Sequence, residues 1–174
     1  SAASDVYKRQ IWGSYMDINT VNEEISLAEA LQMRADIKTR IAQLRSRLND
    51  NAKVQEGETP AEDPLRLIEL LNAECSAYEE LIRRINLTNA ATVLDGQTLT
   101  ALLARRDTLS LELSIMRDFL QQASQRIDRY SKTEIKILPT VDVTAMQKTV
   151  DAKSKELRQL DAAIQKLNWN TMLI

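Results

Sequence analysis

In each of four long segments, apolar residues recur at alternating three- and four-residue spacing, and this pattern constrains the fold more than any other feature of the chain. The third segment shows it most fully, at Leu99, Leu102, Arg106, Leu109, Leu113, Met116, Leu120, Ala123, Ile127 and Tyr130. Such spacing keeps one stripe of a helix against partner helices. The sequence therefore predicts an all-α fold of four long helices in an up-down bundle, with coiled-coil-like seams and two extended end loops.

Cap and breaker residues set the expected ends of these helices. Ser26 and Glu29 have the spacing of a capping box. Asp63-Pro64 is a typical helix start, and Asp142 can cap the fourth helix. We expect helices over residues 26–49, 64–87, 98–130 and 143–168.

The connection between the second and third helices leaves two alternatives. Residues 92–99 can form a small hairpin around Asp95-Gly96, which is a favoured two-residue turn. They can equally form a plain loop. We favour the loop, because an isolated hairpin is only marginally stable.

The other three segments also have seams that follow from the spacing. In the first segment the seam is Leu27, Ala30, Arg34, Ile37, Ile41, Leu44 and Leu48. In the second it is Ile68, Leu71, Cys75, Tyr78, Ile82, Ile85 and Asn89. In the fourth it is Val143, Met146, Val150, Lys153, Leu157, Leu160, Ile164 and Leu167. On this register Cys75 is a small core residue, and Lys153 covers apolar surface with its stem while its ammonium stays in water.

Several large apolar residues fall outside these seams. They are Leu67, Leu70, Leu81, Leu103 and Leu111, together with Trp169, Met172, Leu173 and Ile174 at the end of the chain. Apolar surface that one seam leaves exposed usually marks an interface. We therefore expect a homo-oligomer.

The composition removes several classes of function. The chain has no histidine, the commonest general base and transition-metal ligand. Its one cysteine allows neither an internal disulfide nor a cysteine cluster for zinc, and a reducing, cytoplasmic setting suits it. The net charge of −2, and the lack of an apolar run of about 20 residues, give no sign of nucleic-acid binding or a membrane span. We expect no metal, no cofactor and no nucleic-acid partner, and we favour a protein that is not an enzyme.

The first residues differ in character from the rest of the chain. Residues 1–10 (SAASDVYKRQ) have no apolar periodicity and resemble a translated linker. Met16 is a plausible start of the native protein. We expect residues 1–15 to be a disordered linker and residues 16–174 to form a single helical-bundle domain.

Two groups of polar residues are candidate sites. The cations inside the seams predict a buried polar layer of Arg34, Arg106, Asn86, Asn89, Asp107 and Asp161, with Glu29 as an alternative counter-ion. The layer is either a ligand pocket or a device that fixes helix register. At the other end, the two long connections predict an anion site of Lys53, Arg129, Tyr130 and Lys132, and the alternative there is a solvated loop end.

Several long blocks of the chain resemble a family of small helical bacterial proteins often labelled septicolysin. The blocks are LAEALQMRADIKTRI, NAKVQEGETPAEDP, RINLTNA, LLARRDTL, SQRIDRYSKTEIKILPTVDV and LDAAIQKLNW. The resemblance implies a helical fold, and its label implies a cytolysin. It brings no catalytic residues to carry over.

These observations leave three hypotheses of function. The first, which we favour, is a non-catalytic helical assembly or interaction protein that acts as a homo-oligomer. The second is an enzyme or small-anion-binding protein with its site in the end loops or the polar layer. The third is the membrane-damaging activity that the family label implies.

Overall fold

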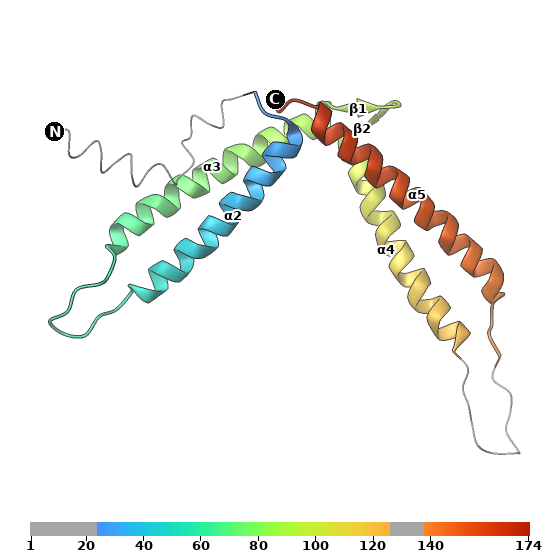
Figure 1. The fold of residues 1–174 in the computed structure, drawn as a ribbon, viewed down its shortest axis with the longest axis horizontal. Coiled ribbons are helices and arrows are strands. Elements are labelled where there is room, and N and C mark those ends of the chain that lie inside the picture. The colour runs from blue at the N-terminus through green and yellow to red at the C-terminus, as the bar shows by residue number, and fades with distance from the viewer. Residues whose placement is uncertain (1–23, 126–137) are drawn as a thin grey trace, which may run out of the picture. The chain divides into compact units, whose positions relative to one another are not determined.

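The computed structural model describes residues 24–125 and 138–174, which form four long helices and one small hairpin (Figure 1). The helices are α2 (Leu27–Asp50), α3 (Pro64–Ala91), α4 (Leu99–Ser124) and α5 (Val143–Asn170). The strands are β1 (Val93–Leu94) and β2 (Gln97–Thr98). An all-α fold is therefore confirmed. The predicted linker, residues 1–15, lies outside the described residues, and a single domain from residue 16 stays a prediction.

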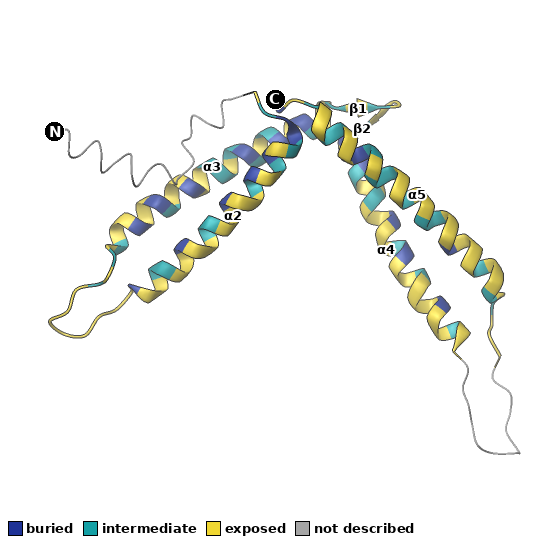
Figure 2. Cartoon of the chain, in the orientation of Figure 1, coloured by how far each residue is buried: buried dark blue, intermediate teal, exposed yellow. Residues whose placement is uncertain are grey.

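The chain divides into two compact units. Unit 1 holds α2, most of α3 and the segment 168–174, and unit 2 holds residues 90–167, which include the β-hairpin, α4 and most of α5. Each unit is built on one antiparallel pair of helices. The exposed and buried residues of both pairs alternate with helical spacing (Figure 2).

The predicted starts of the helices are confirmed, because each start has the local chemistry of an N-terminal helix boundary. Ser26 is the N-cap of α2 and forms the capping box with Glu29. The Asp142 carboxylate accepts from the backbone N–H groups of Thr144 and Ala145 at the start of α5. The end of α4 differs from the prediction, since the helix stops at Ser124 and Gln125 is its C-cap. Residues 126–130 of that predicted helix lie outside the described residues.

Our preference for a plain loop over residues 92–99 was wrong. β1 and β2 pair in an antiparallel hairpin, with Val93 opposite Thr98 and Leu94 opposite Gln97. Asp95 and Gly96 both take positive φ angles, as the predicted two-residue turn requires. The hairpin is not isolated: the Leu99 N–H donates to the Thr92 carbonyl, and Thr98 is also the N-cap of α4. These bonds anchor a strand pair that would be marginal alone.

The predicted seam of the second helix was also wrong, except at Ile85, which is buried. The buried residues of α3 are Leu67, Leu70, Glu74, Leu81, Ile85 and Thr88. Leu67, Leu70 and Leu81, which we expected to lie off the core, are at most 9% exposed, whereas Ile68 and Cys75 are exposed. The sequence misled because the true stripe contains a glutamate, so the neighbouring stripe is the more apolar of the two.

The seams of the other three helices follow the prediction closely. In α2 the buried residues are Leu27, Ala30, Met33, Ile37 and Leu44. In α4 they are Leu99, Leu102, Leu109, Leu113 and Leu120, and in α5 they are Val150 and Ile164. Leu109, Leu113, Leu120 and Val150 form one cluster, with Met116, Val143, Met146 and Leu157 packed around it. Each unit therefore has its own buried seam.

Candidate functional site

Of the four residues of the predicted anion site in the end loops, the structure describes one. Lys53 is exposed, in the loop between α2 and α3. Arg129, Tyr130 and Lys132 lie outside the described residues. The anion site therefore stays a prediction.

The predicted polar layer is divided between the two units. In unit 1, Arg34 is half-buried on α2 and has neither a hydrogen bond nor an ion pair to the described residues. On α3 of the same unit, Asn86 is exposed and Asn89 is half-buried. Glu29, the alternative counter-ion, is engaged in the capping box, where its carboxylate accepts from the Ser26 backbone N–H at 2.7 Å. The bonds to Ser26, first from its backbone and then from its hydroxyl, lower the pKa of Glu29.

In unit 2, Arg106 does pair with a carboxylate, that of its neighbour Asp107, at 2.7 Å. The side chains are 35% and 69% exposed, so this pair lies at the seam edge and contributes little to stability. Asp161 is half-buried on α5. A layer that joins all six predicted residues stays a prediction.

The most buried ionic contact in the described residues joins two residues that sequence analysis missed. The Arg40 Nε and Nη2 atoms donate to the two carboxylate oxygens of Glu74 at 2.9 and 3.0 Å. The side chains are 21% and 7% exposed. Paired, charge-assisted bonds of this geometry compensate for the burial of a carboxylate. The signal was present, since Glu74 continues the spacing of Leu67 and Leu70, but no local pattern pointed to its partner.

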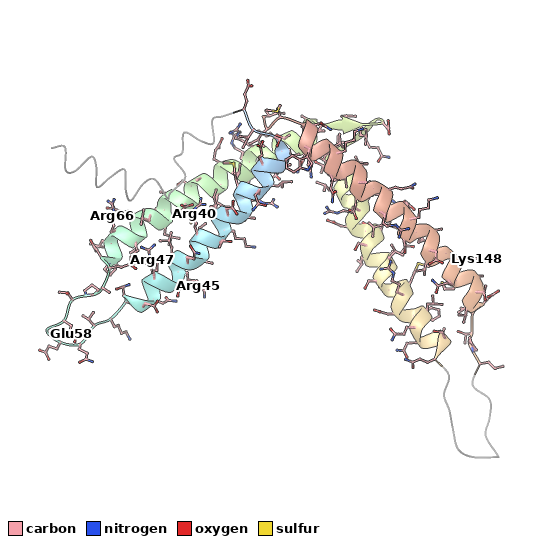
Figure 3. All side chains as sticks on the ribbon, viewed as in Figure 1. Arg40, Arg45, Arg47, Glu58, Arg66 and Lys148 are labelled. Atoms are coloured by element: carbon pink, nitrogen blue, oxygen red, sulfur yellow. The ribbon has the colours of Figure 1, made fainter. Side chains whose placement is uncertain are left out.

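A second guanidinium–carboxylate pair connects the last turn of α2 to the end of the loop that leads into α3. The Arg47 Nε donates to Glu62 at 3.0 Å, and its Nη2 bonds to the other carboxylate oxygen. The hydrogen bond from Arg47 lowers the pKa of Glu62. Asn51, which is buried, accepts from the Glu62 backbone N–H and donates to the Arg47 carbonyl. Figure 3 labels Arg47 and Arg40 along α2.

Residues 171–174 bond to both α2 and α3 at the other end of unit 1. The Leu27 N–H donates to the Thr171 carbonyl at 2.8 Å, and the Leu173 N–H donates to the Ile25 carbonyl at 2.9 Å. On α3, the Arg84 Nε donates to the Ile174 carbonyl, and the Thr88 hydroxyl accepts from the Ile174 N–H. Leu173 is buried, so it does not belong to the residual apolar surface that we predicted.

Described residues of unit 2 line two open grooves between α4 and α5. One of about 770 Å³ is lined by the β-hairpin turn and by Arg105 and Glu156, which pair at 2.7 Å. The other, of about 590 Å³, is polar and is lined by Arg117, Leu120, Gln121, Ser124, Gln147, Val150, Asp151, Ser154 and Arg158. In it, Arg117 donates to the Ser154 hydroxyl at 2.8 Å. Arg158 has no ion pair or hydrogen bond to the described residues.

Lys153, the cation of the fourth seam, is half-buried and paired. Its ammonium lies 2.9 Å from the Glu112 carboxylate on α4, and the lysine side chain is 27% exposed. Within residues 24–125 and 138–174, no group of three or more cysteine or acidic side chains is placed to hold a metal ion. In that same part of the chain, no helix is long and apolar enough to cross a membrane.

Large apolar side chains remain exposed in both units. On α4, Leu111, Ile115 and Phe119 are 63%, 61% and 43% exposed, and their spacing of four residues places them on one side of the helix. We call these three residues the outer α4 stripe. Trp169, Met172 and Ile174 are exposed in unit 1.

Comparisons with known proteins agree with this helical architecture. The model of a family of unknown function, DUF6847, matches residues 34–173. The solved structure of a functionally unknown conserved protein from Corynebacterium diphtheriae is 41% identical in sequence, with a TM-score of 0.80. The match covers 87% of this chain and 100% of that chain. No curated protein matches the chain.

Proposed function

The chain belongs to the DUF6847 family of unknown function, and from its geometry we propose that it is a non-catalytic assembly or interaction protein that acts as a homo-oligomer. The proposal includes up-down packing of the four helices in the assembly and a cytoplasmic location without a nucleic-acid partner. The lone Cys75 and the net charge of −2 support the last two points.

The outer α4 stripe is the observation that carries the proposal. Isolated exposed apolar residues are normal on a protein surface, but three in a row along one helix form a continuous strip. The leucine, isoleucine and phenylalanine side chains stand away from the buried seam of α4, which lies along Leu109, Leu113 and Leu120. Their burial against another protein surface would be favourable, since each large apolar side chain gains about 1.5–3 kcal/mol on full burial.

Light scattering coupled to size exclusion tests the proposal. We expect the full-length protein to elute as an oligomer, and Ile115→Glu to lower its mass because a carboxylate in the strip opposes burial. Ser114→Glu is the matched control, since Ser114 is exposed on the same helix next to the strip. A wild-type protein that keeps the monomer mass over a wide concentration range would contradict the proposal.

A small-anion-binding function is the second candidate, and the polar groove of unit 2 favours it. Ser154 holds Arg117 in place, while the Arg158 guanidinium has no partner among the described residues. Guanidinium groups bind carboxylates and phosphates in paired geometry. Isothermal titration with inorganic phosphate tests this candidate. We expect saturable heat that Arg158→Ala abolishes and that Lys155→Ala, at an exposed cation of the same helix that does not line the groove, leaves unchanged.

A further inference from the structure

The α2 helix carries two rows of cations that differ in their partners. On one row, Arg40 and Arg47 are bound to carboxylates. The other row is Arg34, Lys38 and Arg45, and none of these three has an ion pair or a hydrogen bond to the described residues. Their numbers differ by four and seven, so they lie along one side of the helix. Figure 3 labels Arg45 in this row. Among its described residues, unit 1 therefore presents a line of positive charge that no carboxylate pairs with.

Half-buried apolar residues lie beside this row. Ile41 and Leu48 flank it on α2, and the α3 residues on the same side of the antiparallel pair are Leu71, Tyr78 and Ile82. Leu48 and Leu71 pack against the buried cluster of Leu44, Leu67 and Leu70, which places the two flanks next to each other. We call the three cations and these five apolar residues the cationic face of unit 1. It has the composition of a docking surface for an apolar strip with acidic borders.

The outer α4 stripe has that complementary character. Asp107, Glu112 and Asp118 border it, and α4 has no lysine. Asp107 and Glu112 have partners in unit 2, but Asp118 has none among the described residues. The arginines of α4 lie nearer to its α5 side, where Arg105 bonds to Glu156 and Arg117 bonds to Ser154. The stripe is thus apolar in the middle and acidic at its edge.

We infer that the outer α4 stripe of one copy docks on the cationic face of unit 1 of a second copy. The inference rests on the proposed homo-oligomeric function and names its interface. Two cationic faces would repel each other, and two outer stripes would bring Asp118 and its neighbours against like charges, so a contact between unlike faces is favoured. Such a contact is heterologous, and it propagates head to tail into a ring or a filament.

The test uses two full-length variants that each destroy one face. Ile115→Glu places a charge in the outer stripe, and Ile82→Glu places one in the cationic face. Each chain keeps one intact face, so we expect each variant alone to be monomeric and an equimolar mixture to form a dimer that does not grow further. Far-UV circular dichroism checks that both variants are folded. A mixture that stays monomeric would overturn the inference.

Charge reversal tests the same contact without changing the apolar core. We expect Arg45→Glu and Asp118→Arg each to weaken self-association by about tenfold or more, and added salt to weaken the wild-type association. Mixing the two variants should restore association, because the reversed faces complement each other. Reversal that leaves the association constant unchanged would overturn the inference.

The outcomes also separate this inference from the proposed function. If the wild-type protein is monomeric, both fail. If it is oligomeric and neither pair of variants changes its mass, the interface is wrong and the homo-oligomer stands. Sedimentation with phosphatidylserine vesicles tests whether the cationic face binds a membrane surface instead. Arg45-dependent binding to vesicles, with no effect of Arg45→Glu on self-association, would assign the face to a membrane and overturn the inference.

Discussion

Unit 1 and unit 2 are both antiparallel helix pairs, yet they are held together in different ways. In unit 1 the seam contains the bidentate Arg40–Glu74 pair, with the glutamate buried, and a clasp from residues 171–174 closes one end. In unit 2 the seam is a stripe of leucines, and the ionic contacts between the helices, Arg105–Glu156 and Lys153–Glu112, lie at its edges. The same architecture is therefore specified by buried polar geometry in one unit and by apolar spacing in the other.

This difference shows that a charged residue determines the alignment of two packed helices where it is buried. A buried carboxylate loses its hydration and is tolerated in only one alignment of the two helices, the one that brings its guanidinium partner opposite. Exposed pairs remain hydrated in any alignment, so they distinguish alignments weakly. We expect the alignment of α2 on α3 to depend on Glu74, and that of α4 on α5 to depend on apolar side chains.

The largest expected effect comes from removal of the buried carboxylate. Glu74→Ala should lower the free energy of unfolding by about 3–5 kcal/mol, because Arg40 is left without its partner in a mostly buried position. Glu112→Ala, which removes an edge contact of unit 2, should cost about 0–1 kcal/mol. Urea unfolding followed by circular dichroism measures both. Equal costs would abolish the contrast between the units.

Core truncation tests whether the apolar seams of the two units are equally important. Leu81→Ala in unit 1 and Leu113→Ala in unit 2 should each cost about 2–5 kcal/mol, since both side chains are fully buried. Cys75→Ala is the control in α3, and at an exposed position it should stay within about 0.5 kcal/mol. The same unfolding experiment applies. A large cost at Cys75 would restore the seam that we first predicted and remove the one seen in the structure.

The helix caps offer a smaller comparison. The Ser26 hydroxyl in unit 1 accepts from the Glu29 N–H and donates to the Glu29 carboxylate. The Thr98 hydroxyl in unit 2 accepts from the Ala101 N–H and makes no second bond of this kind to the described residues. We expect Ser26→Ala to cost about 1–2 kcal/mol and Thr98→Ala about 0.5–1 kcal/mol. Thermal melting of both variants measures the difference, and a greater loss at Thr98 would show that reciprocal capping adds nothing.

The smallest expected effect is a difference in acid sensitivity. In unit 1 the pKa values of Glu29, Glu62 and Glu80 are lowered from 4.5, in each case mainly by a hydrogen bond to the carboxylate. A lowered pKa in the folded state adds stability above the ordinary pKa, and this stability is lost as the pH falls through the lowered value. Unit 1 should therefore weaken more steeply than unit 2 below about pH 4.5.

Hydrogen exchange of individual amides at a series of acidic pH values measures this difference for each unit separately. Glu62→Gln should flatten the acid dependence of unit 1, while Glu112→Gln, the control in unit 2, should leave it unchanged. An equal loss of protection in both units as the pH falls would show that the units do not differ in acid sensitivity.

Most of the secondary structure followed from the residues alone, and the candidate site followed only in part. Ser26, Pro64, Thr98 and Asp142 mark the helix starts, and the Arg106–Asp107 pair involves adjacent residues, so these features could be predicted. The Arg40–Glu74 pair could not, because its members are 34 residues apart and Glu74 looks like a surface residue in a local pattern. The β-hairpin was missed because its stability depends on its anchorage to α4.

By itself, the sequence determined that this protein is helical, where its helices begin, and that one stripe of each should be buried, because caps and periodicity act over a few neighbouring residues. Only the tertiary structure decided which stripe of α3 is buried. Two stripes competed, one with Cys75 and one with Glu74, and the more polar one is buried because Arg40 lies opposite it on α2. The burial of a charge depends on its partner across the seam, and no local pattern contains that partner.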